Sequence, residues 1–160
     1  LDVGGPAQQW IQWVGYGRGV TSRESYLSAF SYPTGFSYSD VAGVAEYVRQ
    51  RTTQEDRVYL WGFDALLHFL DGRRSVGRYG YNLPLVAGPQ QDMLAARREL
   101  LDALQRDPPP FIVVQKDDSN NLTRFSSRDE LPRFRALSRL IDDSYHRSYE
   151  NSNFVVYRRQ

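Results

Sequence analysis

The chain has 160 residues, which suit one domain of ordinary size, and its 41% share of hydrophobic residues is enough to build a core. Its formal net charge is +1, from 20 Lys and Arg against 19 Asp and Glu, so it offers no basic field for nucleic acid phosphates. Cysteine is absent, which excludes disulfides, thiolate chemistry and cysteine-based metal sites, and no apolar run approaches the roughly 20 residues that cross a bilayer.

Residues 1–20 are rich in glycine and aromatic side chains. Trp10, Trp13 and Val14 are spaced as on one face of a short helix, which the glycines that follow would end. The stretch fits an arm that follows a presumed membrane span, and it fits equally a surface arm that packs its tryptophans. Residues 21–160 are expected to form a single domain.

The next residues predict two helices separated by a loop. Thr21 and Glu24 have the spacing of a capping box, so a helix is expected from residue 22 to about residue 30. A loop over residues 31–37 follows, because proline and glycine interrupt the pattern. Ser39 or Asp40 is expected to cap a second helix, ending near residue 52. Its apolar residues repeat at the spacing of one helix face: Val41, Val44, Ala45 and Val48.

The middle of the chain alternates strands and helices. Residues 57–63 are β-prone and apolar on both faces, as in the central strand of a covered sheet. We expect a helix over residues 64–70, then a strand over residues 76–81. A long helix over residues 89–106 should end at the prolines that follow it. Its inward side chains would be Leu94, Leu100, Leu101 and Leu104.

A buried strand over residues 111–114 and a polar loop over residues 117–121 follow. The last elements are a helix from about Pro132 to Asp142 and a hairpin of strands over residues 145–149 and 154–158. This order predicts an α/β fold: a three-layer sandwich with a mostly parallel central sheet and a C-terminal antiparallel hairpin at its edge.

The side chains that best indicate a ligand-binding site follow two predicted strands. In open α/β sheets, ligands bind outside the carboxyl ends of the strands. Aromatic and arginine side chains there would suit a sugar or an anionic ligand. The alternative is that Trp61 and Phe63 belong to the core and Asp64 caps a helix. The candidate ligand-binding residues are Trp61, Phe63, Asp64, Arg78, Tyr81 and Asn82.

The other sequence patterns give weaker indications of a functional site. His68 and His146 stand far apart without a partner motif, so we expect structural roles, no metal site and no cofactor. The glycine-rich residues 15–19 lack the third glycine of a dinucleotide-binding loop. Three acidic pairs are expected to be solvated at turns or helix ends: Glu55-Asp56, Asp117-Asp118 and Asp142-Asp143. No residue stands out as catalytic.

Several segments carry a family resemblance in their order along the chain. They are residues 22–27, 40–52, 56–63, 70–74, 78–79, 100–114 and 154–158. Together they resemble the C-terminal part of bacterial protein-mannosyltransferase-like membrane proteins. Those proteins belong to the GT-C glycosyltransferase superfamily, with aminoarabinose transferases as relatives.

The resemblance implies a parent enzyme with many membrane helices and a polyprenyl-phosphate-linked sugar donor. The catalytic acid of such enzymes lies in the first extracytoplasmic loop, between early transmembrane helices, and these residues do not include that loop. The chain would then be a non-catalytic accessory domain on the periplasmic face of the cytoplasmic membrane, acting in acceptor recognition or docking. Its partner would be the membrane-embedded remainder of the same chain. The alternatives are a stand-alone binding module for a small molecule and a protein-interaction domain that uses the aromatic arm.

Overall fold

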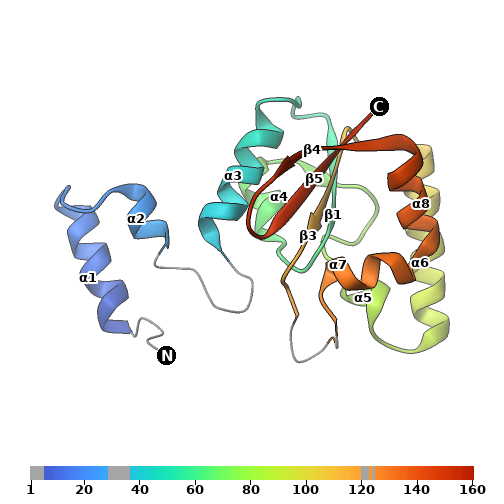
Figure 1. Ribbon diagram of the computed structural model, residues 1–160, viewed down its shortest axis with the longest axis horizontal. Coiled ribbons are helices and arrows are strands. Elements are labelled where there is room, and N and C mark those ends of the chain that lie inside the picture. The colour runs from blue at the N-terminus through green and yellow to red at the C-terminus, as the bar shows by residue number, and fades with distance from the viewer. Residues whose placement is uncertain (1–5, 29–36, 120–122, 124) are drawn as a thin grey trace.

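The computed structural model describes residues 6–28, 37–119, 123 and 125–160. The described residues form one five-stranded sheet with helices on both faces (Figure 1). The helices are α1 (Pro6–Gly17), α2 (Arg23–Ser28), α3 (Tyr38–Arg49), α4 (Leu66–Asp71), α5 (Leu83–Val86), α6 (Gln90–Arg106), α7 (Ser127–Glu130), the 3₁₀ helix η1 (Leu131–Arg133) and α8 (Arg135–Ser144). The strands are β1 (Arg57–Trp61), β2 (Arg74–Ser75), β3 (Phe111–Gln115), β4 (Tyr145–Glu150) and β5 (Phe154–Arg159).

The sheet order is β2-β1-β3-β5-β4. Strand β1 pairs in parallel with β2 and β3, with Val58 opposite Phe111 and Trp61 opposite Val114. Strand β5 is antiparallel to both β3 and β4, so the C-terminal hairpin closes one side of the sheet. The predicted fold class is therefore confirmed: an α/β sandwich whose mixed sheet has the parallel strands β2-β1-β3 and an antiparallel hairpin at its edge.

The core has two halves because the side chains of β1 and β3 alternate between the faces of the sheet. On one face, Val58 and Leu60 pack with the buried valines of α3 and with Leu67 of α4. On the other, Tyr59 and Trp61 pack with side chains from α5, α6 and α8. Burial on both faces explains why these strands read as continuous apolar runs.

The strand predicted over residues 76–81 is wrong. Only Arg74 and Ser75 pair with β1, and the chain then turns away from the sheet. Gly77 has a φ of 75°, in the left-handed region that interrupts a strand. Val76 is buried against the face covered by α6, so its apolar character reflects core packing rather than strand pairing.

The structure also differs from the sequence predictions at two helix starts and at one side chain of α6. Ser37, not Ser39 or Asp40, caps α3, and its Oγ accepts a hydrogen bond from the Asp40 N–H at 3.3 Å. The predicted loop over residues 31–37 lies outside the described residues except for Ser37. Pro132 lies in η1, and α8 begins three residues later. Leu94 was expected inward, yet 42% of it is exposed.

Helices α1 and α2 form a short arm beside the main body (Figure 1). Ser22, not Thr21, caps α2, because its Oγ accepts a hydrogen bond from the Ser25 N–H at 3.1 Å. The glycines after α1 serve the turn between the two helices: Gly19 adopts a φ of 71°. A Cβ on Gly15 would lie 2.3 Å from the Thr21 Oγ1, so a larger residue there would require the Thr21 side chain to move.

Candidate functional site

The carboxyl ends of β1 and β3 lie side by side, since these strands are parallel neighbours. Gln115 ends β3, and its buried side chain reaches across to the turn after β1. Its Oε1 accepts hydrogen bonds from the N–H of Phe63 at 2.9 Å and of Asp64 at 3.0 Å. A Cβ on Gly62 would lie 2.7 Å from Gln115, so glycine is needed for this approach.

Asp118, just beyond β3, connects this edge to α7. One carboxylate oxygen accepts a hydrogen bond from the Ser127 N–H at 2.6 Å. The other accepts from the Ser127 hydroxyl at 2.5 Å and from the Phe63 N–H at 3.2 Å. Asp118 is 5% exposed, so these hydrogen bonds are largely shielded from solvent. They hold three segments of the chain together.

Ser127 in turn accepts hydrogen bonds from two further side chains. The Asn82 Nδ2 donates to its Oγ at 2.7 Å, and the Trp61 Nε1 donates to its carbonyl oxygen at 2.7 Å. The Asn82 N–H donates to the carbonyl of Gly62 at 3.0 Å, which brings the segment before α5 against the end of β1. We call the set Asp64, Asn82, Gln115, Asp118 and Ser127 the carboxyl-edge cluster.

The structure brings four of the six predicted site residues to this edge. Trp61 and Asn82 meet through Ser127, and Phe63 and Asp64 meet through Gln115. Trp61 is fully buried, so it presents no stacking face to a ligand. Asp64 also caps its turn, since its Oδ1 accepts a hydrogen bond from the Leu66 N–H. That these residues bind a ligand stays a prediction.

Arg78 and Tyr81 differ from the other four. The Arg78 Nε pairs with Glu99 Oε1 on α6 at 3.1 Å, and its guanidinium lies 4.8 Å from the Tyr79 ring. The side chain of Tyr81 is 44% exposed. Because residues 76–81 form a turn rather than a strand, they do not carry these two side chains along the sheet edge as the sequence pattern suggested.

The electrostatics of the carboxyl-edge cluster come from burial. Burial raises the pKa of Asp64, the Leu66 N–H lowers it, and the neighbouring Asp118 raises it further. Burial also raises the pKa of Asp118, against the lowering effect of its hydrogen bonds from Ser127 and Phe63. Proton uptake at this edge is therefore favoured more than at an exposed carboxylate.

Two acceptor oxygens of the cluster have no hydrogen-bond partner in the described part of the chain. They are the buried Asp64 Oδ2 and Asn82 Oδ1. Hydroxyl groups, amines or water could satisfy such acceptors. The Ser127 hydroxyl is committed to Asp118 and is 1% exposed, which suits holding the edge together rather than nucleophilic attack. Among the described residues, no group of three or more His, Asp or Glu side chains could hold a metal ion.

Sequence reasoning missed Gln115, Asp118 and Ser127. Asp118 was grouped with Asp117 as a solvated pair, but only Asp117 is exposed. A local signal for α7 was present: Ser126 is followed three residues later by Asp129, and the Ser126 Oγ accepts a hydrogen bond from the Asp129 N–H at 3.2 Å. That pattern would have predicted the helix start that carries Ser127.

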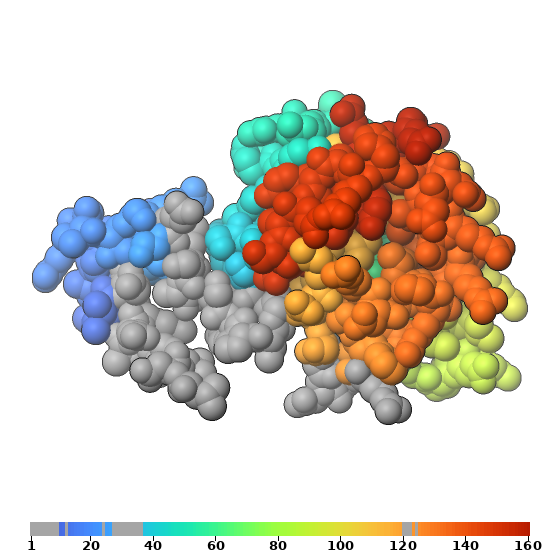
Figure 2. Space-filling model, in the orientation of Figure 1, coloured from blue at the N-terminus to red at the C-terminus, as the bar shows by residue number. Residues whose placement is uncertain are grey.

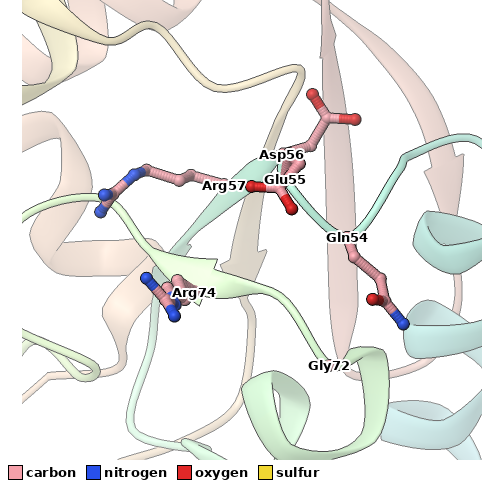
Figure 3. A pocket seen from close by; sticks show the side chains of 6 residues that line it. All are labelled: Gln54, Glu55, Asp56, Arg57, Gly72 and Arg74. Atoms are coloured by element: carbon pink, nitrogen blue, oxygen red, sulfur yellow. The ribbon is translucent and has the colours of Figure 1, made fainter.

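A hollow of about 410 Å³ lies at the opposite, amino end of the parallel strands (Figure 3). Carboxylates and guanidinium groups both line it, and Figure 3 shows Arg57 and Arg74 on one side and Gln54 on the other. The Arg57 Nε is paired with Asp107 Oδ2 at 3.1 Å. The mixed charges favour neither an anion nor a cation here. The lining residues are Gln54, Glu55, Asp56, Arg57, Gly72 and Arg74.

Beside this hollow, Asp71 is completely buried. Its Oδ1 accepts a hydrogen bond from the Arg73 N–H at 2.7 Å, while the Arg73 guanidinium donates to the carbonyls of Asp71 and Thr52 at 3.0 Å each. The Asp71 Oδ2 has no partner within the described residues. Burial raises the pKa of Asp71 to about 6, although the N–H and charge of Arg73 lower it.

This buried carboxyl predicts a pH-dependent stability. Because its folded pKa exceeds its unfolded value, Asp71 costs no stability below about pH 4 and destabilises the fold increasingly as the pH rises to about 6. We expect Asp71→Asn, which keeps an acceptor for the Arg73 N–H, to be more stable than the parent at pH 7 by about 1–3 kcal/mol. Urea unfolding at pH 4 and pH 7 measures the difference. A gain of equal size at both pH values would contradict this origin, and exposed Asp142→Asn is the control.

The comparisons with known proteins add no family assignment. Neither a family model nor a curated protein matches this sequence. The function therefore has to be argued from the sequence resemblance and from the geometry above.

Proposed function

We propose that this chain is the accessory extracytoplasmic domain of a protein-mannosyltransferase-like membrane protein of the GT-C superfamily. It would act beside the membrane-embedded remainder of the same chain, on the periplasmic face of the bacterial cytoplasmic membrane. One observation carries the proposal most directly. The segments with the family resemblance are those that build the framework: residues 40–52 contain most of α3, residues 56–63 contain β1, and residues 100–114 contain the end of α6 and most of β3.

The role we propose is acceptor recognition or docking, without catalysis by the chain itself. The carboxyl-edge cluster supports this role, because Asp64 is partly exposed there and its carboxylate can accept a hydrogen bond from a hydroxyl group of a glycan or of a polyprenyl-phosphate-linked substrate. Asn82 is fully buried and would support the edge from within. The buried hydroxyl of Ser127 is held by Asp118 and Asn82, which fits a positioning role. Transfer chemistry would belong to the membrane-embedded part.

The parent membrane protein provides the test. Deleting residues 21–160 is expected to lower sugar transfer by about tenfold or more, because the acceptor would no longer be held near the reacting sugar. The isolated chain should show no transfer with the same donor. Asp64→Ala in the parent should raise the KM for the acceptor, whereas Asp117→Ala, at an exposed neighbouring position, should not. Full activity of a correctly folded deletion protein would refute the proposal.

A further inference from the structure

Helix α1 carries the largest exposed group of apolar side chains in the arm. Trp10 and Ile11 are each 66% exposed, Trp13 is 58% exposed and Tyr16 is 43% exposed. None of these residues belongs to either half of the hydrophobic core. Tryptophan side chains left this open to water lose the favourable free energy of burial, so the face is suited to a contact outside the described fold.

The arm is nevertheless an ordered unit that can present this face. The Tyr16 ring stacks on the Tyr26 ring of α2, with centroids 4.9 Å apart and planes 11° from parallel. The tight turn at Gly19 and the approach of Thr21 to Gly15 fix how α2 folds back on α1. Figure 2 shows the two helices, in blue, projecting at one side of the molecule. Trp10 and Trp13 are themselves in contact, with ring centroids 5.8 Å apart.

The charges around α1 indicate what covers it. Within residues 6–23 the charged residues are Arg18 and Arg23, and the acidic residues nearest to this stretch are Asp2 before it and Glu24 after it. Both arginines are exposed, near the C-terminal end of α1. Uncharged aromatic residues followed by two cations match the boundary of a lipid bilayer. There, tryptophan and tyrosine rings occupy the headgroup level and arginines contact anionic phosphates.

The length of α1 decides how such a contact would be made. Twelve residues give a helix about 18 Å long, well short of the roughly 30 Å hydrocarbon core. Among the described helices, none is long and apolar enough to cross a membrane. A short helix with an apolar aromatic face can instead lie in the plane of the interface with that face buried.

We propose that α1 is an interfacial anchor: Trp10, Ile11 and Trp13 enter the headgroup region of an anionic bilayer, and Arg18 and Arg23 contact its phosphates. This goes beyond the function proposed above, because it assigns lipid binding to the 160-residue chain itself. The two ideas can fail separately. Absence of vesicle binding would remove the anchor and leave the transfer experiment in the parent protein untouched.

The test uses the 160-residue chain and vesicles of phosphatidylcholine, with or without phosphatidylglycerol. We expect the chain to co-sediment with the anionic vesicles, and brominated lipid to quench its tryptophan fluorescence. Trp61 is fully buried, so the quenched signal would come from Trp10 and Trp13. The Trp10→Ala/Trp13→Ala double variant should bind about tenfold more weakly or worse. Its thermal unfolding should be unchanged, because both side chains lie outside the core.

A matched control and a charge variant sharpen the result. Phe69 on α4 is 81% exposed and lies on the main body, so Phe69→Ala should bind like the parent. Arg18→Ser/Arg23→Ser should weaken binding to anionic vesicles and reduce its dependence on salt. The proposal is overturned if the parent chain binds neither vesicle or if the tryptophan double variant binds equally well. It also fails if sedimentation velocity shows a dimer that this variant dissociates, because the face would then belong to a second copy.

Discussion

Trp61→Ala is expected to lower the free energy of unfolding by about 3–5 kcal/mol, among the largest effects available from one substitution in this fold. The indole is fully buried between the sheet and its covering helices, with its ring 5.9 Å from that of Phe134. Truncation would leave a cavity and would also remove the hydrogen bond from Nε1 to the carbonyl of Ser127. Urea unfolding, followed by circular dichroism, measures the loss.

A second substitution separates the two contributions. Trp61→Phe keeps most of the apolar volume but leaves the Ser127 carbonyl without its donor, so its cost should be smaller, about 1–3 kcal/mol. Exposed Trp10→Ala is the control and should change the free energy of unfolding by about 0.5 kcal/mol or less. A small loss for Trp61→Ala, close to that of the control, would show that the ring is not part of the core.

Asp118→Ala is expected to destabilise the fold by about 3 kcal/mol or more. The substitution removes the acceptor for the Ser127 N–H and the Ser127 hydroxyl and leaves these two donors buried, whereas the Phe63 N–H loses one of its two acceptors and keeps Gln115 Oε1. It should also loosen α7 from the end of β3. Amide hydrogen exchange is the second readout, with faster exchange expected at Ser127, whose N–H loses its acceptor.

Asp117→Ala is the matched control for Asp118→Ala. The two aspartates are adjacent in sequence, but Asp117 is exposed, so its replacement should cost about 0.5 kcal/mol or less. Asp118→Asn should fall between the two, because an amide keeps one acceptor oxygen but loses the charge that strengthens these bonds. Equal losses for both alanine variants would mean that Asp118 does not hold this edge together.

The part of the fold that the sequence predicted well is the part governed by periodic burial. The helix spacing of Val41, Val44, Ala45 and Val48 gave α3, and all four side chains are buried. The runs at β1 and β3 are apolar on both faces because helices cover both sides of the sheet. The prediction over residues 76–81 failed because burial of Val76 does not require strand pairing, and Gly77 turns the chain.

Only part of the candidate site could be predicted from the sequence. The rule that ligands bind at the carboxyl ends of strands drew attention to Asp64, and Asn82 was found at the same edge. Gln115 and Ser127 could not be placed with them, because their hydrogen bonds join residues more than forty positions apart in the chain. A pattern of residues that are close together in the sequence does not indicate such a long-range contact.

The sheet order has a consequence for how the protein is made. Strand β5 follows every other strand in the chain, yet it lies between β3 and β4. Until residues 154–159 have left the ribosome, β3 has a bare edge and β4 has no neighbour in the sheet. Between the synthesis of β3 and that of β5, the nascent chain therefore carries an unfinished sheet, with the apolar residues of β3 open to mispairing. A premature stop after β4 would leave a product for proteolysis rather than a slightly shortened domain.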